Sequence, residues 1–318
     1  MRRLRLYILK IIRFFTRNIW VVSAQVGSSA FKKIWYRIFR ILSIAIEQFS
    51  KNRCSASASD LTYNTLFAIV PFFAIAYGIA ISFGMETVLN DQIHAALSGQ
   101  GSLSEKLILF AQKTIAETKG RLITTVGSVF FIWSIFSMLG NIETTMNQIW
   151  GVRKNRRFRW RMLNYFLFTV FGPILLVVGS AVNIFVSSNI IEAIPDETIQ
   201  NSLSFLTNFL IPIAIFSFLF FTIYYGMPNR AISLRVALVA AILAGATFQI
   251  LQYYYFNIQM YVSSYNGIYG SFAALPLLLV WLRTSWVVVL FGAELAFAIE
   301  REIRFTVSQQ SRQPFHKP

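Results

Sequence analysis

The chain has 318 residues, of which 56% are hydrophobic and only 13% carry a charged side chain. That charged share is about half of the roughly 25% usual in a soluble domain, and a soluble fold of this length has too little interior to hide so much apolar surface. A lipid bilayer instead makes apolar side chains the favoured exterior. Composition therefore excludes an ordinary soluble protein and predicts an all-α, polytopic membrane helix bundle.

The net charge of +16 would suggest nucleic acid binding in a soluble protein. Here the basic residues stand in blocks beside apolar runs, which is typical of cytoplasmic membrane flanks. We therefore expect contact with anionic lipid headgroups and none with nucleic acid. The single cysteine, Cys54, allows no intramolecular disulfide and is interpreted as an inert residue near the membrane surface.

Residues 1–55 form a basic N-terminal segment. Within residues 31–49, apolar side chains recur at intervals of three and four, and lysine and arginine occupy the other positions. This pattern predicts a basic amphipathic helix in the headgroup region, with a soluble helical hairpin as the alternative. A weaker pattern in residues 4–19 predicts another such helix. Basic residues interrupt every apolar stretch of the first 17 residues, so a cleaved signal peptide is not expected.

Six transmembrane helices are predicted within residues 56–300, because a span needs about 20 apolar residues. Charge-free windows place the first four at 61–85, 122–142, 162–191 and 198–229. The charge-free run 236–282 is too long for one span, and the polar stretch 257–271 divides it, which places the last two spans near 236–256 and 272–299. Four spans contain a proline, which is expected to kink the helix (Pro71, Pro173, Pro212 and Pro276). Residues 103–118, between the first two spans, predict an amphipathic surface helix.

The charges between the spans predict the orientation. Residues 1–60 hold twelve lysines and arginines, residues 153–161 are basic without any acid, and basic residues also follow the fourth and sixth spans. The intervening connections are neutral or acidic. This alternation follows the positive-inside rule, so both termini, including the basic tail 301–318, are predicted to be cytoplasmic.

Ionisable residues inside spans are candidate functional groups, because a charge in the bilayer is costly. The sixth span contains Arg283 and Glu294, which lie eleven residues apart on one helix face, about 16 Å along the axis. Glu294 is expected either to pair with an inner-loop arginine or to serve transport. Arg283 is expected to reach another helix or a water-filled cavity.

Further candidates lie at the ends of the spans. Glu143 and Asn147 share a helix face at the end of the second span. Trp150 suits an interfacial aromatic belt, and Asp60 is expected to cap the first span. Tyr265 and Tyr269 lie in the outer loop 261–271, which is either a substrate-facing segment or a plain aromatic-belt turn.

Enzyme signatures are missing from the sequence. The two histidines, His94 and His316, lie in the outer loop and the tail, and no metal-ligand spacing, phosphate-binding loop or nucleophile elbow is present. We therefore expect no enzymatic activity, no cofactor and no catalytic or metal site.

Three stretches carry a resemblance to a known family. They are residues 61–71, with Tyr63; residues 147–152, with the basic run that follows; and residues 265–296. The third contains Ile268-Tyr269-Gly270-Ser271, Pro276, Trp281, Ser285-Trp286 and Gly292-Ala293-Glu294. Over about residues 40–300 the chain resembles the YihY/virulence factor BrkB family of bacterial inner-membrane proteins.

This resemblance implies six spans, a plasma-membrane location and a transport role. The family pattern usually has an uncharged residue at the position of Arg283, so it implies no shared role for this arginine. Such proteins have also been called ribonuclease BN, an activity that no residue constellation here supports. The leading hypothesis is a transporter or exporter of an amphiphilic or lipidic substrate. The alternatives are a non-transporting membrane scaffold and, third, a lipid-modifying enzyme. The substrate and the oligomeric state stay open.

Overall fold

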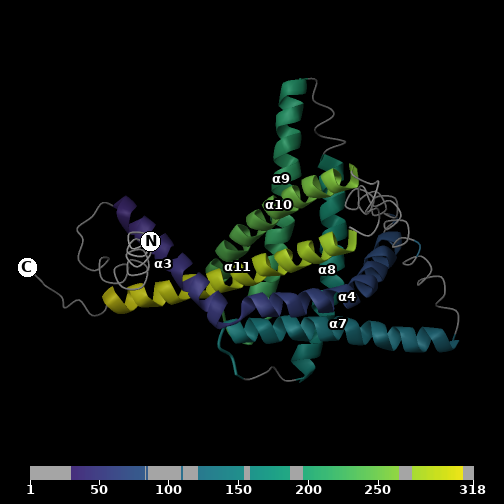
Figure 1. Cartoon of the computed structure of the whole chain (residues 1–318), viewed down its shortest axis with the longest axis horizontal. Coiled ribbons are helices and arrows are strands. Elements are labelled where there is room, and N and C mark those ends of the chain that lie inside the picture. Colours follow the sequence, from purple (N-terminus) through teal and green to yellow (C-terminus); the bar gives the residue numbers. More distant parts are fainter. Residues whose placement is uncertain are drawn as a thin grey trace, which may run out of the picture.

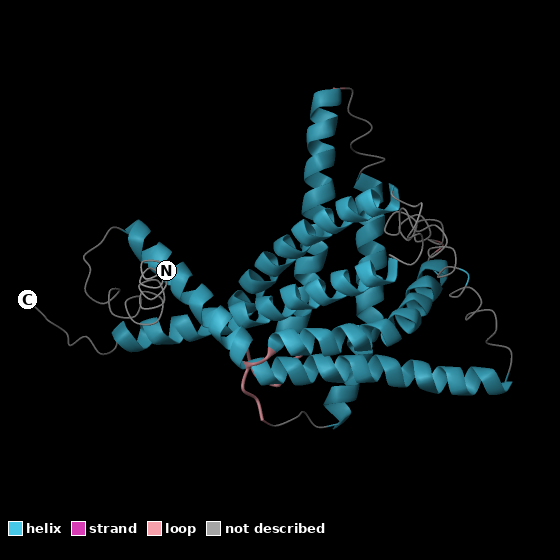
Figure 2. Ribbon diagram, in the orientation of Figure 1, coloured by secondary structure: helices cyan, strands magenta, loops and turns pink. Residues whose placement is uncertain are grey.

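The computed structural model describes residues 30–82, 84, 109, 121–153, 158–186, 196–264 and 274–310. These residues form helices, and no strand occurs among them (Figure 2). The all-α prediction is therefore confirmed. The helices predicted at residues 4–19 and, apart from Leu109, at 103–118 lie outside the described residues. The described helices are α3 (Ala30–Lys51), α4 (Cys54–Ser82), α7 (Arg121–Ile149), α8 (Phe158–Phe185), α9 (Glu197–Gly226), α10 (Leu234–Ser264) and α11 (Ala274–Gln310).

The six predicted spans correspond to α4 and α7 to α11. Four segments within them are long and apolar enough to cross a membrane: Arg159–Gly179, Thr207–Gly226, Leu234–Met260 and Pro276–Phe305. Helices α4 and α7 each have 29 residues, which exceeds the length of about 20 that a span requires. The count of six and the cytoplasmic termini stay predictions.

Helix α11 organises the bundle. It packs against α10, α4 and α3, while α9 packs against α10 and α8. In Figure 1, α3 and the C-terminal half of α11 extend together away from the other helices. The core lies where α7, α9, α10 and α11 meet, and α10 contributes a row of buried alanines to it (Ala237, Ala240, Ala241 and Ala244).

Two glycines allow the closest helix contacts. A Cβ on Gly245 of α10 would overlap the Ser217 side chain and lie 2.9 Å from the Ser217 backbone nitrogen on α9. A Cβ on Gly292 of α11 would overlap the hydroxyl group of Tyr224. That hydroxyl is buried and donates to the carbonyl of Val289 at 2.8 Å. Small residues thus let α9, α10 and α11 approach closely, as in other membrane bundles.

The first span begins earlier than predicted. Helix α3 ends at Lys51, Arg53 has a positive φ of 52°, and α4 starts at Cys54. Asp60 therefore lies in the second turn of α4 and is exposed. The prediction that Asp60 caps the span was wrong, because a charge-free window marks where charges stop and not where the backbone turns into a helix.

The predicted amphipathic helix 31–49 is confirmed as α3. One face packs on α11 through Ile44 and Ala45, and a buried ion pair joins Arg40 to Glu302 at 3.3 Å. The opposite face exposes apolar side chains, which are Phe31, Ile34, Trp35, Ile38, Leu42 and Ile46. Insertion of this face into the headgroup region stays a prediction.

One proline prediction and one aromatic prediction need correction. Pro276 is the third residue of α11, where no backbone N–H is required, so it does not kink the helix. Pro173 and Pro212 do lie inside α8 and α9. Trp150 is buried, not part of an exposed belt, because its indole packs on Phe297 and under Arg230.

Candidate functional site

Buried and half-buried polar side chains gather where α7, α8 and α11 meet the α3–α4 junction, and we call this group the polar layer (Asn52, Cys54, Glu143, Asn147, Arg161, Tyr165 and Glu294). Glu143 of α7 is 4% exposed. Its Oε2 accepts hydrogen bonds from the Tyr165 hydroxyl at 2.6 Å and from Nε of Arg161 at 3.1 Å. Arg161 and Tyr165 are neighbours four residues apart on α8, so α8 is joined to α7 through one carboxylate.

Glu294 has different partners. Its side chain is fully buried, and its Oε1 accepts from Nδ2 of Asn52 at 2.7 Å and from Sγ of Cys54 at 3.3 Å. The carbonyl of Asn52 in turn accepts from Gln148 of α7 at 3.0 Å. The predicted pairing with an inner-loop arginine was wrong. Glu294 instead joins α11 to the α3–α4 junction, and its Oε2 is buried with no hydrogen-bond partner.

Cys54 is held inside this contact. Its side chain is 1% exposed, and its thiol donates to the Glu294 carboxylate. A buried thiol is out of reach of other reactants, which agrees with the interpretation of Cys54 as inert.

Asn147 connects α7 to the turn between α9 and α10. Its Oδ1 accepts from the backbone N–H of Asn229 at 2.7 Å. Just beyond, Gly151 has a positive φ of 63°, and the N–H of Val152 donates to the carbonyl of Asn147, which ends α7. Glu143 and Asn147 thus share a buried face, as predicted, but bind separate partners.

The other predicted site residues lie apart from the polar layer. Arg283 is exposed and donates to the hydroxyl groups of Ser55 and Ser59 on α4, at 3.1 Å and 3.2 Å. It therefore reaches another helix, one of the two expectations. Tyr63 is 63% exposed and packs edge-on against Phe67. Tyr265 and Tyr269 lie outside the described residues.

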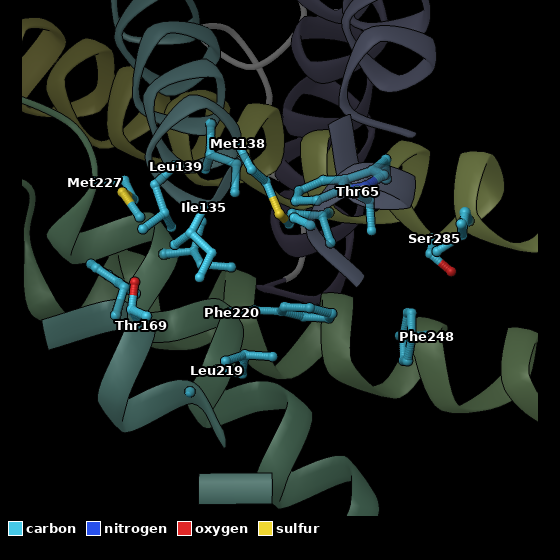
Figure 3. Close-up of a pocket in the computed structure, with 18 of the residues that line it drawn as sticks. Thr65, Ile135, Met138, Leu139, Thr169, Leu219, Phe220, Met227, Phe248 and Ser285 are labelled. Atoms are coloured by element: carbon cyan, nitrogen blue, oxygen red, sulfur yellow. Dashed lines mark hydrogen bonds between the residues drawn. The ribbon is translucent and has the colours of Figure 1, made fainter. Parts of the chain in front are cut away.

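Beside the polar layer lies an apolar cavity of about 360 Å³. Figure 3 shows that Ile135, Met138 and Leu139 of α7 face Leu219 and Phe220 of α9 across it, with Met227 and Ser285 at opposite ends of the labelled set. Helices α4, α8, α10 and α11 complete the wall, with Thr65 and Ala68 from α4; Phe168, Thr169 and Gly172 from α8; Phe248 from α10; and Trp281, Leu282, Ser285, Trp286 and Val289 from α11.

The hydroxyl groups in the cavity wall are already hydrogen-bonded. Thr65 donates to the carbonyl of Leu61 at 2.7 Å and accepts from the indole of Trp286 at 2.9 Å. Thr169 and Ser285 donate to the carbonyls four residues earlier in their own helices. Such a cavity suits hydrocarbon better than water.

The polar layer borders the cavity without lining it. Ile142, in the wall, precedes Glu143, and Thr169, also in the wall, donates to the carbonyl of Tyr165. The 360 Å³ is in the lower part of the range for small-molecule sites, roughly 300–1,000 Å³. In the described part of the chain no three His, Cys, Asp or Glu side chains gather at metal-binding distance.

Several contacts were not predicted from sequence. Asn52 donates to Glu294, and Tyr165 donates to Glu143, across the sequence. Two ion pairs, Glu302 with Arg40 and Glu300 with Arg230, also join residues far apart in the chain. Two of the side-chain pairings could have been found from their spacing in the sequence. Tyr165 follows Arg161 by four residues, and Arg304 follows Glu300 by four, the spacing of neighbours on a helix face.

The chain was compared with known proteins. Residues 45–316 match the family model described as Virulence factor BrkB. Relatives include UPF0761 membrane proteins of Chromohalobacter salexigens, 31% identical over 81% of this chain and 63% of that protein, and of Acinetobacter baylyi, 29% identical over 85% and 63%. A UPF0761 membrane protein of Pseudomonas aeruginosa is 31% identical over 78% and 60%.

The chain spans about three fifths of the length of these curated relatives. No solved structure matches it. The relatives are membrane proteins, in agreement with the apolar helices described above, and the family match covers the polar layer from Asn52 to Glu294 and the whole cavity wall. The chain therefore belongs to the BrkB virulence factor family of membrane proteins.

Proposed function

We propose that this protein moves an amphiphilic or lipidic molecule across the membrane. The apolar cavity carries the proposal. It is walled by six helices, and its hydroxyl groups have partners within the protein, so an acyl chain loses little by entering it. A hydrophilic solute would find few free hydrogen-bonding groups there.

One wall of the cavity contains a proline inside its helix. Thr169 and Gly172 of α8 line the cavity, and Pro173 follows them inside the helix. Because proline has no N–H, the carbonyl of Thr169 lacks its helical donor at position 173. Membrane helices with such breaks bend where neighbouring groups satisfy the freed carbonyl. A bend at this point would change the width of the cavity.

The test is lipid movement in proteoliposomes. Fluorescent lipid in the inner leaflet is protected from dithionite, so the rate at which it becomes quenched reports transfer between leaflets. Leu219→Trp would fill the cavity, and Leu210→Trp on the lipid-exposed part of the same helix is the matched control. We expect Leu219→Trp to remove the protein-dependent transfer and Leu210→Trp to retain it. Equal rates in the two variants would count against the cavity as the path.

The exposed apolar face of α3 favours a second candidate, a membrane scaffold that moves no substrate. The face belongs to an arm held on α11 by the Arg40–Glu302 pair, and large exposed apolar faces often mark sites of contact. Purification in mild detergent separates the two candidates. A stable protein partner together with no lipid movement by the wild type would favour the scaffold.

A further inference from the structure

We propose that a row of glutamines on α10 binds the uncharged polar headgroup of the transported amphiphile; this rests on the transport function proposed above. Gln249, Gln252 and Gln259 follow one another along α10. Each has a buried amide atom with no hydrogen-bond partner: Oε1 in Gln249 and Gln252, and both amide atoms in Gln259. We call these three residues the glutamine row.

The glutamine row begins where the cavity ends. Phe248 of α10 lines the cavity, and its ring lies 6.5 Å from that of Trp281, which also lines it. Tyr255, two turns farther along α10, packs on the same indole with ring centroids 5.4 Å apart. Gln252 lies between Phe248 and Tyr255 on this helix face, four residues after one and three before the other.

The row continues along the buried face of α10. Gln259, four residues beyond Tyr255, is 2% exposed, whereas Tyr253, Tyr254 and Ile258 on the opposite face are each more than half exposed. A buried amide without a partner is rare in a folded protein, because burial removes its water without replacing it. Gln249 and Gln252 are half-buried with only Oε1 enclosed, and Gln259 is buried with both amide atoms enclosed. We infer that these unpartnered amide atoms, which follow one another along α10, meet a ligand.

Trp281 supplies a fourth unpartnered group. Its indole forms part of the cavity wall, and its Nε1–H is buried with no acceptor. A ligand whose chain occupies the cavity would therefore meet an N–H donor at the cavity wall and carboxamide donors and acceptors beyond it.

The chemistry of these groups selects the headgroup. Carboxamides and an indole N–H are neutral, and residues 236–282 contain no charged side chain. Arg283 of α11, two residues after Trp281, is engaged with Ser55 and Ser59 of α4, so a phosphate or carboxylate buried among these amides would lack a cationic partner. A headgroup with hydroxyl or amide groups, such as that of a monoacylglycerol, fits instead.

Native mass spectrometry of the full chain tests this with two probes that share one acyl chain. The probes are 1-oleoylglycerol and the matching lysophosphatidate, which differ by one phosphate. We expect tighter binding of 1-oleoylglycerol, and we expect Gln252→Leu and Gln259→Leu each to weaken it by about five- to tenfold, the effect of one lost hydrogen bond. Asn257→Leu, on the exposed face of α10, should leave the affinity unchanged.

Melting temperature separates a binding role from a structural one. Because the glutamine amides have no partner in the protein, Gln252→Leu and Gln259→Leu should melt at or above the wild-type temperature while binding less ligand. Lower melting temperatures with unchanged affinity, or equal affinity for both probes, would overturn the proposal. If Leu219→Trp still blocks lipid transfer in that case, only the headgroup site fails; if it does not, the transport function fails too.

Discussion

Glutamine substitutions at the two buried glutamates of the polar layer should have opposite effects on stability. Glu294→Gln keeps an oxygen for Asn52 and Cys54 and puts an uncharged amide where Oε2 has no partner. A neutral amide is cheaper to bury than a carboxylate, so we expect the free energy of unfolding to stay the same or to rise by about 1 kcal/mol.

Glu143→Gln removes a charge that has a cationic partner. Nε of Arg161 lies 3.1 Å from Oε2 of Glu143, and the arginine side chain is 32% exposed while that of the glutamate is 5% exposed. Loss of one partner of a fully buried pair costs about 3–5 kcal/mol. Because water reaches Arg161 in part, we expect a smaller loss, about 1–3 kcal/mol.

The assay is the melting temperature of the full chain in nanodiscs. In a chain of this size, 1 kcal/mol corresponds to roughly 2 °C. Glu143→Gln should therefore melt about 2–6 °C below wild type, and Glu294→Gln at or above it. Glu294→Ala is the control that removes the acceptor and should lower the temperature. The reasoning is refuted if Glu294→Gln is destabilised as much as Glu143→Gln, because the charge and not the acceptor would then hold the α3–α4 junction.

Three further predictions follow from the packing. Gly245→Ala and Gly292→Ala should each lower the free energy of unfolding by about 1–3 kcal/mol, because the added methyl group overlaps the facing helix; thermal melting measures this, and a neutral result would contradict the close approach. Cys54 should stay unlabelled by maleimide, since its thiol is buried against Glu294; intact mass reports labelling, and rapid modification of the folded protein would contradict the burial. Arg40→Ala should increase proteolysis within residues 30–51, because α3 loses its ion pair to Glu302; unchanged cleavage relative to wild type would show that apolar packing alone holds α3.

The sequence by itself determined the helical class, the family and the approximate helix positions. Long charge-free windows need no tertiary information, because the cost of burying charge in a bilayer acts on each segment separately. The same local logic predicted α3, whose apolar and basic residues alternate with the helical period. The stretch 265–296, together with the two shorter stretches 61–71 and 147–152, indicated the family, which the match over residues 45–316 shows.

Tertiary structure decided everything that depends on which helices meet. Glu294 and Glu143 look alike in sequence, as acids near the ends of predicted spans, yet one binds Asn52 and Cys54 and the other binds Arg161 and Tyr165. The turn at Arg53 determines where α4 starts. Asp60 therefore lies in the second turn of α4, where it is exposed. The cavity combines side chains from six helices. Hydropathy records how apolar each helix is, but contacts between helices depend on small residues and single polar groups whose partners lie tens to hundreds of residues away.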